Sequence, residues 1–172
     1  MVVRPAIPSD APGAAWVHFE TWRVAYRDIV VPEVIASRSL ELRQRQWAEL
    51  LADPARRSGA FVAAHNDEVV GFATGGAELS GQLGVAGEIY SLYVLPAHHR
   101  GGVGRRLVRA VAGHVSALGH RDLLIWVLAD NPARGFYERL GGVQRHERAV
   151  EFAGVALREV GYVWPDISAL GQ

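Results

Sequence analysis

Apolar residues recur at helical spacing in three stretches of the chain. The first runs from Ser9 or Asp10, which are N-cap candidates, to about Tyr26, and the second covers Ser39–Ala52. The third covers Val103–Leu118 and ends at a glycine, and its apolar stripe consists of Leu107, Val111, Val115 and Leu118. The pattern therefore predicts three amphipathic helices.

Strands are predicted where β-branched and aromatic residues alternate or run together between turn residues. In chain order these runs are VVRPA, GAFVAAH, EVVGFATGG, EIYSLYVL, DLLIWVL, VQRHERAVEF and ALREVGYVW. Asn66-Asp67 is typical of a hairpin turn, and the glycine-rich segment 75–87 is predicted to be a loop. DLLIWVL is apolar throughout, as in a strand that is buried on both faces. A short helix is predicted from Asn131, with Pro132 at its first position, to Leu140.

The run EIYSLYVL has an irregular apolar phase. Ile89, Leu92 and Val94 are spaced by three and then two residues, which a regular strand cannot place on one face. We therefore expect a β-bulge near Ser91. The element order β-α-α-β-β-β-α-β-α-β-β predicts a mixed α/β fold in a single domain that covers residues 1–172.

Composition excludes several classes of protein. The chain has 172 residues, no cysteine, zero formal net charge and a pI near 7.1, and all its 18 basic residues are arginine. Disulfides and cysteine nucleophiles are therefore excluded, and nucleic acid is a disfavoured partner. No run approaches the length of a membrane span, and the histidines have no metal-like spacing. We expect a cytoplasmic protein without a metal or a membrane partner.

The segment HHRGGVGRRL, residues 98–107, lies between a predicted strand and a predicted helix, which is the general arrangement for binding a phosphate group. A P-loop requires lysine, which the chain lacks, and the third glycine of a dinucleotide fingerprint would fall on Leu107. Four arginines gather near the helix N-terminus, where cations are unfavourable unless an anion is bound: Arg100, Arg105, Arg106 and Arg109. A solvated arginine-rich face is the alternative interpretation.

EIYSLYVLPAHHRGGVGRRLV resembles the central strand, pyrophosphate loop and helix of the GNAT superfamily of N-acetyltransferases, whose loop pattern is [QR]-x-x-G-x-[GA]. Gly102 and Gly104 occupy the two small positions, and His99 stands where the family has Gln or Arg. NPARGFYERLGG similarly resembles the second family motif, with Gly142 in place of a usual phenylalanine. The resemblance implies a mixed central sheet of six to seven strands flanked by about four helices, with a bulged strand splayed from its neighbour.

The resemblance also implies an activity, which is the transfer of an acetyl group from acetyl-CoA to an amine by direct attack in a ternary complex. The residues that it assigns to acetyl-CoA are Leu92, Tyr93, Val94, His99, Arg100, Gly101, Gly102, Val103, Gly104, Arg105, Asn131, Arg134 and Tyr137. The backbone N–H of Val94 is expected to polarise the thioester carbonyl. Asn131 also suits a helix N-cap.

Two residues are candidates for proton transfer. Glu88 is the candidate base that takes a proton from the acceptor amine, directly or through water, and a solvated carboxylate at a strand edge is the alternative. Tyr137 is the candidate acid for the leaving thiolate, because we expect Phe136 and Leu140 to face the core and to turn this tyrosine toward the cofactor. A tyrosine that only bonds the sulfur or solvent is the alternative.

The acceptor site is expected near the first helix. Trp22 and Tyr26 lie four residues apart on one helical face, and with Glu88 and Tyr90 they are the predicted acceptor-binding residues, although such an aromatic pair also suits a core. The leading function is acetylation of a small amine. A protein N-terminal or lysine acetyltransferase and a non-catalytic acyl-CoA sensor are the alternatives. The family resemblance also implies a possible homodimer, but no residue pattern in the sequence supports one.

Overall fold

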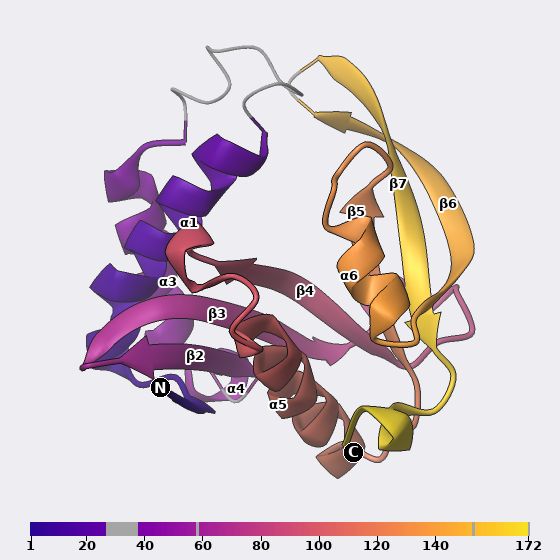
Figure 1. Ribbon diagram of the computed structural model, residues 1–172, viewed down its shortest axis with the longest axis horizontal. Helices are drawn as coiled ribbons and strands as arrows, with labels where there is room; N and C mark the ends of the chain where they lie inside the picture. The colour runs from indigo at the N-terminus through magenta and orange to yellow at the C-terminus, as the bar shows by residue number, and fades with distance from the viewer. Residues whose placement is uncertain (27–37, 58, 153, 172) are drawn as a thin grey trace. The chain divides into compact units, whose positions relative to one another are not determined.

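The computed structural model describes residues 1–26, 38–57, 59–152 and 154–171. Within them, seven strands form one mixed sheet in the order β1-β2-β3-β4-β5-β7-β6 (Figure 1). The strands are β1 (Val2–Pro5), β2 (Ala60–His65), β3 (Glu68–Ala77), β4 (Gly87–Val94), β5 (Leu123–Leu128), β6 (Val143–Phe152) and β7 (Val155–Trp164). The helices are α1 (Ala11–Ala25), α3 (Leu40–Ala52), α4 (Pro54–Arg57), α5 (Val103–Ala117) and α6 (Arg134–Arg139), with short 3-10 turns at Pro8–Asp10, Pro96–His98 and Ile167–Gly171.

The residues group into two compact units. The first unit contains Met1–Thr74 and Ser91–Val111, and the second contains Gly75–Tyr90 and Ala112–Gln172. The mixed α/β class and the element order expected from the sequence are confirmed, with α4 and the 3-10 turns as additions. The break in the helical pattern that the sequence predicts at Ile29–Pro32 lies outside the described residues. Among the described helices, none has the length and apolar character that a membrane crossing requires.

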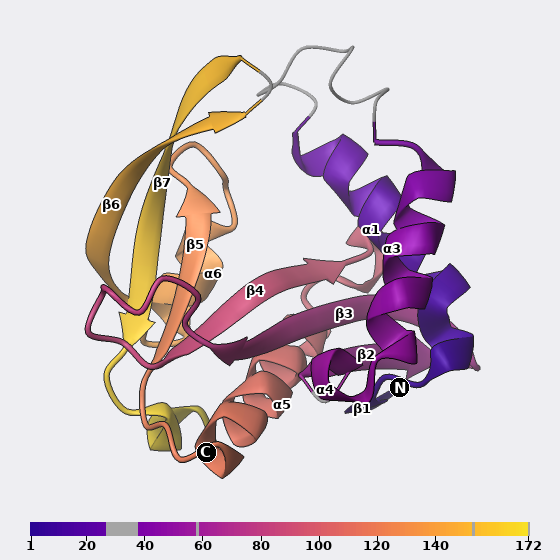
Figure 2. The same ribbon diagram turned by 180° about the vertical axis from the view of Figure 1, so that it is seen from behind.

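In the first unit, α1 and α3 lie side by side (Figures 1 and 2). Their buried faces meet Val62 of β2 and Phe72 of β3, and Val17, Trp47 and Leu51 complete the centre of this core. The α3 helix begins as predicted, since Ser39 accepts a hydrogen bond from the N–H of Leu42 at 3.2 Å. The sequence therefore predicts the start of α3 correctly.

The start of α1 differs from the prediction in its capping. Asp10 occupies the N-cap position but makes no capping bond with its side chain. Its two carboxylate oxygens instead accept hydrogen bonds from both terminal nitrogens of Arg4, at 2.7 and 2.8 Å, and one also accepts from the N–H of Ile7. The carboxylate is buried, so this bidentate pair ties β1 to the beginning of α1.

The hairpin between β2 and β3 is confirmed. Asn66 and Asp67 both have positive φ values, 49° and 65°, as a two-residue hairpin turn requires. Farther along β3, Gly71 allows a close approach, because a Cβ there would stand 3.0 Å from the carbonyl oxygen of Tyr93 and 3.4 Å from Leu107. This glycine therefore lets α5 and β4 pack tightly on β3 within the first unit.

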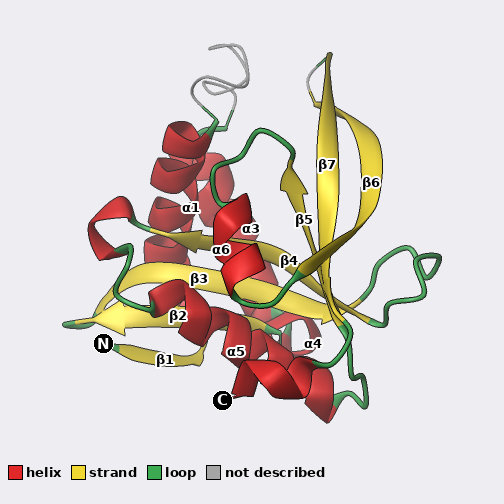
Figure 3. Cartoon of the chain, turned by 45° about the vertical axis from the view of Figure 1, so that its right-hand side comes forward, coloured by secondary structure: helices red, strands yellow, loops and turns green. Residues whose placement is uncertain are grey.

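In the second unit, β5 is buried and pairs on both sides (Figure 3). It runs parallel to β4, with Glu88 opposite Leu124 and Ile89 opposite Ile125, and antiparallel to β7. The β6–β7 hairpin at the end of the chain is as predicted. The bulge near Ser91 and the splaying of β4 from β5 stay predictions.

Three expectations about local structure are wrong. The helix after β5 begins at Arg134, not at Asn131, because residues 131–133 form a turn in which the side chain of Asn131 accepts from the N–H of Ala133 at 2.8 Å. Leu118 is exposed, since α5 ends at Ala117 and the chain turns there. The predicted loop 75–87 is shorter, since β3 continues to Ala77 and β4 begins at Gly87.

Candidate active site

The glycine-rich segment connects the end of β4 to the start of α5, both within the first unit. Leu92, Tyr93 and Val94 end the strand, and Val103 begins the helix. Gly102 has a φ of +74°, a conformation that favours glycine, and a Cβ placed there would meet nothing within 4 Å. The loop therefore leaves the backbone at the helix N-terminus open to a ligand, as a phosphate-binding segment requires.

Three arginines of this segment form no salt bridge with another described residue. Arg100 and Arg105 are exposed, Arg106 is half-buried, and among the described residues none of the three takes part in a salt bridge. Arg100 also has a positive φ of 62°, which is strained for a residue other than glycine. Cations at a helix N-terminus oppose the helix dipole, so the segment is suited to a polyanion.

His99 departs from the expected motif, and the structure shows what it contacts. Its Nε2 lies 2.8 Å from the carbonyl oxygen of Val94, and because a carbonyl can only accept, this ring nitrogen carries the proton. The imidazole thus joins the loop to the end of β4. Its predicted contact with the cofactor stays a prediction.

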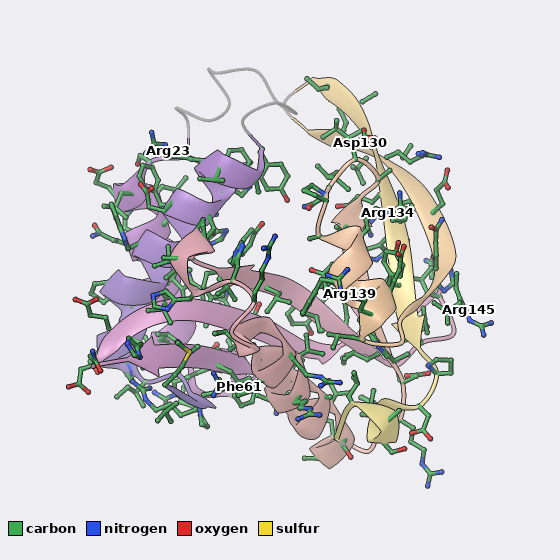
Figure 4. The ribbon with its side chains drawn as sticks, in the orientation of Figure 1. Arg23, Phe61, Asp130, Arg134, Arg139 and Arg145 are labelled. Atoms are coloured by element: carbon green, nitrogen blue, oxygen red, sulfur yellow. The ribbon has the colours of Figure 1, made fainter. Side chains whose placement is uncertain are left out.

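The second motif lies in the second unit, around α6. Arg134 lies on α6 (Figure 4). It donates from Nη1 to the carbonyl oxygen of Ala129 at 2.9 Å, from Nε to the hydroxyl of Tyr162 at 3.0 Å and from Nη2 to Gln144 at 3.1 Å. The bond to Tyr162 and the nearby carboxylate of Glu138 raise the pKa of Arg134. These bonds fasten α6 to β7, so the guanidinium has a structural role beside its predicted role toward acetyl-CoA.

Tyr137 is not turned out of the core as the sequence suggested. It is the buried residue of α6, 6% exposed, whereas Phe136 and Leu140 are only half-buried. Its ring packs against Tyr162 and Trp164, with centroid distances of 6.0 and 6.4 Å. The face that the sequence pattern assigned to the core is therefore only half-buried, and the core contact of this segment is made by Tyr137.

Glu88 lies at the start of β4, in the second unit. Its carboxylate is 8% exposed, so the alternative of a solvated strand edge is wrong. Burial raises the pKa of Glu88 above its usual value, the N–H of Leu79 opposes this by donating to Oε2 at 3.2 Å, and Glu78 raises the pKa further. A carboxyl whose pKa is moved toward neutrality is suited to accept and release a proton.

Tyr90 belongs to the same cluster as Glu88. Its hydroxyl donates to the carbonyl oxygen of Ala77 at 2.6 Å, and the side chain is 42% exposed. Burial raises the pKa of Tyr90, with further contributions from Glu88 and Glu78. The phenol therefore stays protonated at neutral pH and can donate.

Trp22 and Tyr26, which the sequence places on one helical face, contact each other. Their rings stack with centroids 4.7 Å apart and an interplanar angle of 23°. Trp22 is buried and Tyr26 half-buried, so the tryptophan belongs to the core and the tyrosine reaches its margin. Within the described residues no group of three or more metal-ligating side chains occurs.

The sequence analysis missed a cluster beside this pair. His18 of α1 stacks on Tyr93 of β4, with centroids 5.2 Å apart, and lies 5.3 Å from the ring of Phe72. Burial, with Arg43 and Arg38 nearby, lowers the pKa of His18 to about 3. The available signal was spacing, because His18, Trp22 and Tyr26 follow one another at intervals of four on the same helical face.

Comparison with known proteins defines the class of this fold. A putative acetyltransferase of Salmonella typhimurium, yncA, determined with its cofactor acetyl-CoA, superposes with a TM-score of 0.68 over 95% of this chain and 92% of that chain, at 19% identity. An uncharacterised N-acetyltransferase of Bacillus subtilis (strain 168), YuaI, is 34% identical over 99% of this chain and 96% of its own. The mycothiol acetyltransferase of Streptomyces scabiei (strain 87.22) is 33% identical over 83% of this chain, which spans 43% of that relative.

The sequence model described as the acetyltransferase (GNAT) family matches residues 19–142. The chain belongs to this family, and the resemblance seen in the sequence is confirmed. It is an acetyl-CoA-dependent acetyltransferase.

Proposed function

We propose that the protein transfers the acetyl group of acetyl-CoA to the primary amine of a small molecule, by direct attack in a ternary complex. The observation that carries this proposal is the buried carboxylate of Glu88, whose pKa is raised by its surroundings. A primary amine is mostly protonated at neutral pH and attacks only after losing a proton. Glu88 is assigned to take that proton, directly or through a water molecule.

The first unit is assigned to acetyl-CoA. The open backbone at Gly102 fits a pyrophosphate, as do Arg100, Arg105 and Arg106, which form no salt bridge with another described residue. A pyrophosphate carries negative charge and many hydrogen-bond acceptors. Residues 92–94 and 99–105 would bind the cofactor, and the N–H of Val94 would polarise the thioester carbonyl. The thioester supplies the acetyl group and a thiol that leaves readily.

The α6 segment is assigned to the cofactor as well. The side chain of Asn131 already accepts a hydrogen bond within a turn, and Arg134 already donates hydrogen bonds to oxygen atoms of the protein. Binding of the cofactor would therefore be a second role for both residues. Tyr137 is proposed as the acid that protonates the leaving thiolate. Its buried ring supports a fixed position for the hydroxyl.

A small acceptor is favoured over a protein by one comparison. The mycothiol acetyltransferase of Streptomyces scabiei is named for a small molecule and is 33% identical to this chain. Acetylation of a protein N-terminus or of a lysine is the second candidate activity, and acyl-CoA sensing without catalysis is the third. We also propose a cytoplasmic location. Light scattering would show whether the protein forms a homodimer.

The test is a screen of acceptors for the release of thiol from acetyl-CoA. A panel of amino acids, polyamines and aminoglycosides is compared with peptides that carry a free N-terminus or a lysine. Turnover of small amines with higher kcat/KM than the peptides supports the proposal. Faster turnover of peptides identifies a protein acetyltransferase, and binding of acetyl-CoA without turnover of any acceptor identifies a sensor.

A further inference from the structure

Arg43 is a buried cation that has no carboxylate partner among the described residues. The side chain lies on α3 and is 8% exposed. Its Nη1 donates to the amide oxygen of Gln46 at 3.0 Å, whereas its buried Nε has no hydrogen-bond partner in the part of the chain that the structure describes. Among the described residues, no carboxylate forms a salt bridge with it. A buried guanidinium normally has its donors satisfied, so this one calls for a functional explanation.

The described groups that act on the charge of Arg43 include no carboxylate. Those that act on it electrostatically are Arg38, Tyr26 and Tyr93. Burial lowers the pKa of Arg43, Arg38 lowers it further, and the two phenol groups oppose this. His18 is neutral at physiological pH, because its pKa is about 3. The cation of Arg43 therefore lies among the aromatic side chains of His18, Tyr26 and Tyr93.

The location of this charge connects it to the acceptor. Tyr26 belongs to the aromatic pair that the sequence analysis assigned to acceptor binding. Tyr93 precedes Val94, whose N–H is proposed to polarise the thioester. Both tyrosines interact electrostatically with Arg43, and all these residues belong to the first unit. An anion bound at Arg43 would therefore lie beside the residues proposed to bind the reacting molecules.

We propose that Arg43 binds the carboxylate of the acceptor, so that the substrate class is an amine that also carries a carboxylate, such as an amino acid. This inference rests on the proposed small-molecule acetyltransferase activity and names its substrate class. A guanidinium offers planar donors that match the two oxygens of a carboxylate. A carboxylate brings one negative charge for the one buried guanidinium of Arg43, whereas a phosphate brings up to two.

The test uses matched acceptors and matched variants. Each amino acid in a series of increasing chain length is compared with its primary amide, which keeps the amine and lacks the charge. Arg43→Gln removes the cation, and Arg43→Lys keeps the charge without the planar donors of the guanidinium. Arg45→Gln is the control at an exposed position of the same helix. Binding to the full-length protein saturated with CoA is measured by calorimetry, and turnover is measured with acetyl-CoA.

The wild-type protein is expected to bind and acetylate a carboxylate better than its amide. Arg43→Gln should lower the affinity for the carboxylate-bearing acceptor by about 30-fold or more, mainly as a rise in KM, because a hydrogen-bonded charge pair is lost. The affinity for the amide should change little. The affinity of Arg43→Lys for the carboxylate should lie between those of the wild type and Arg43→Gln, and Arg45→Gln should match the wild type. A phosphonate analogue that binds better than the carboxylate overturns the choice of anion.

Two results overturn the whole inference. One is equal binding of carboxylate and amide by the wild type, which leaves the proposed function intact if amides are acetylated. The other is an equal loss of affinity for the carboxylate and the amide in Arg43→Gln. Arg43→Met provides a readout independent of ligands, because replacing an unpaired buried charge by an apolar side chain should raise the melting temperature. A large fall in melting temperature identifies a structural arginine and counts against the proposal.

Discussion

The indole Nε1 of Trp47 on α3 lies 3.4 Å from Nδ1 of His18 on α1. An indole nitrogen can only donate, so Nδ1 accepts and the imidazole is neutral. The two helices are thereby joined through a histidine that the fold keeps unprotonated, and its ring forms one wall of the corner around Arg43.

The first prediction concerns stability in acid. The pKa of His18 is about 3 in the folded protein and 6.5 in an unfolded chain. Below pH 6.5 the unfolded state therefore binds more protons, and the stability contributed by this residue is lost as the pH falls toward 3. Between those values His18→Gln should reduce the slope of unfolding free energy against pH by up to about 1.4 kcal/mol per pH unit. Urea unfolding across this range measures the slope, with His65→Gln at an exposed position as control.

The second prediction concerns Glu88. Its pKa is raised in the folded state, so its contribution to stability is present at low pH and is lost as the pH rises through the folded value. Glu88→Gln should therefore raise the melting temperature at neutral pH and lower kcat/KM. The loss of rate should be largest at moderate pH and smaller at high pH, where unprotonated amine is abundant.

Glu151→Gln, an exposed carboxylate of β6, is the control for this variant. A loss of rate in Glu88→Gln that stays constant across pH, with a lower melting temperature, would show that the carboxylate supports the fold and does not accept the proton.

The third prediction concerns Gly104, in the first turn of α5. Gly104→Val places a branched side chain where the pyrophosphate is proposed to approach the backbone, so the affinity for acetyl-CoA should fall strongly. Stability should hold, because valine has a better helix propensity than glycine. Gly113→Val on the same helix is the matched control, since a Cβ there meets nothing within 4 Å. Unchanged calorimetric affinity in Gly104→Val would disprove the cofactor assignment.

The fourth prediction concerns Tyr137. Tyr137→Phe keeps the ring that packs on Tyr162 and Trp164, so the melting temperature and the affinity for acetyl-CoA should hardly change. A thiol is a fair leaving group unaided, so loss of the acid should lower kcat by about tenfold or more, near the low end for this form of catalysis. Wild-type turnover in this variant, with chemistry shown to limit the rate, would rule out the acid role.

Local patterns were sufficient to predict most elements of this protein. The apolar spacing in Ser39–Ala52 predicted α3, and the turn residues Asn66-Asp67 predicted the β2–β3 hairpin. The glycines and arginines of residues 98–107 indicated the family. They could do so because the function of this loop depends on backbone groups that are close together in the sequence. Such features follow from the sequence because side-chain spacing and backbone preferences act within a few residues.

Burial of individual side chains depended on the tertiary structure. Packing against Tyr162 and Trp164 made Tyr137 the buried residue of α6, and the packing around β4 desolvated Glu88. His18, Arg43 and Tyr93 come from α1, α3 and β4, so no local pattern could show that they meet. Desolvation and the field of neighbouring charges depend on which distant residues surround a group, and that is why the fold alone decided the charge state of His18 and the isolation of Arg43.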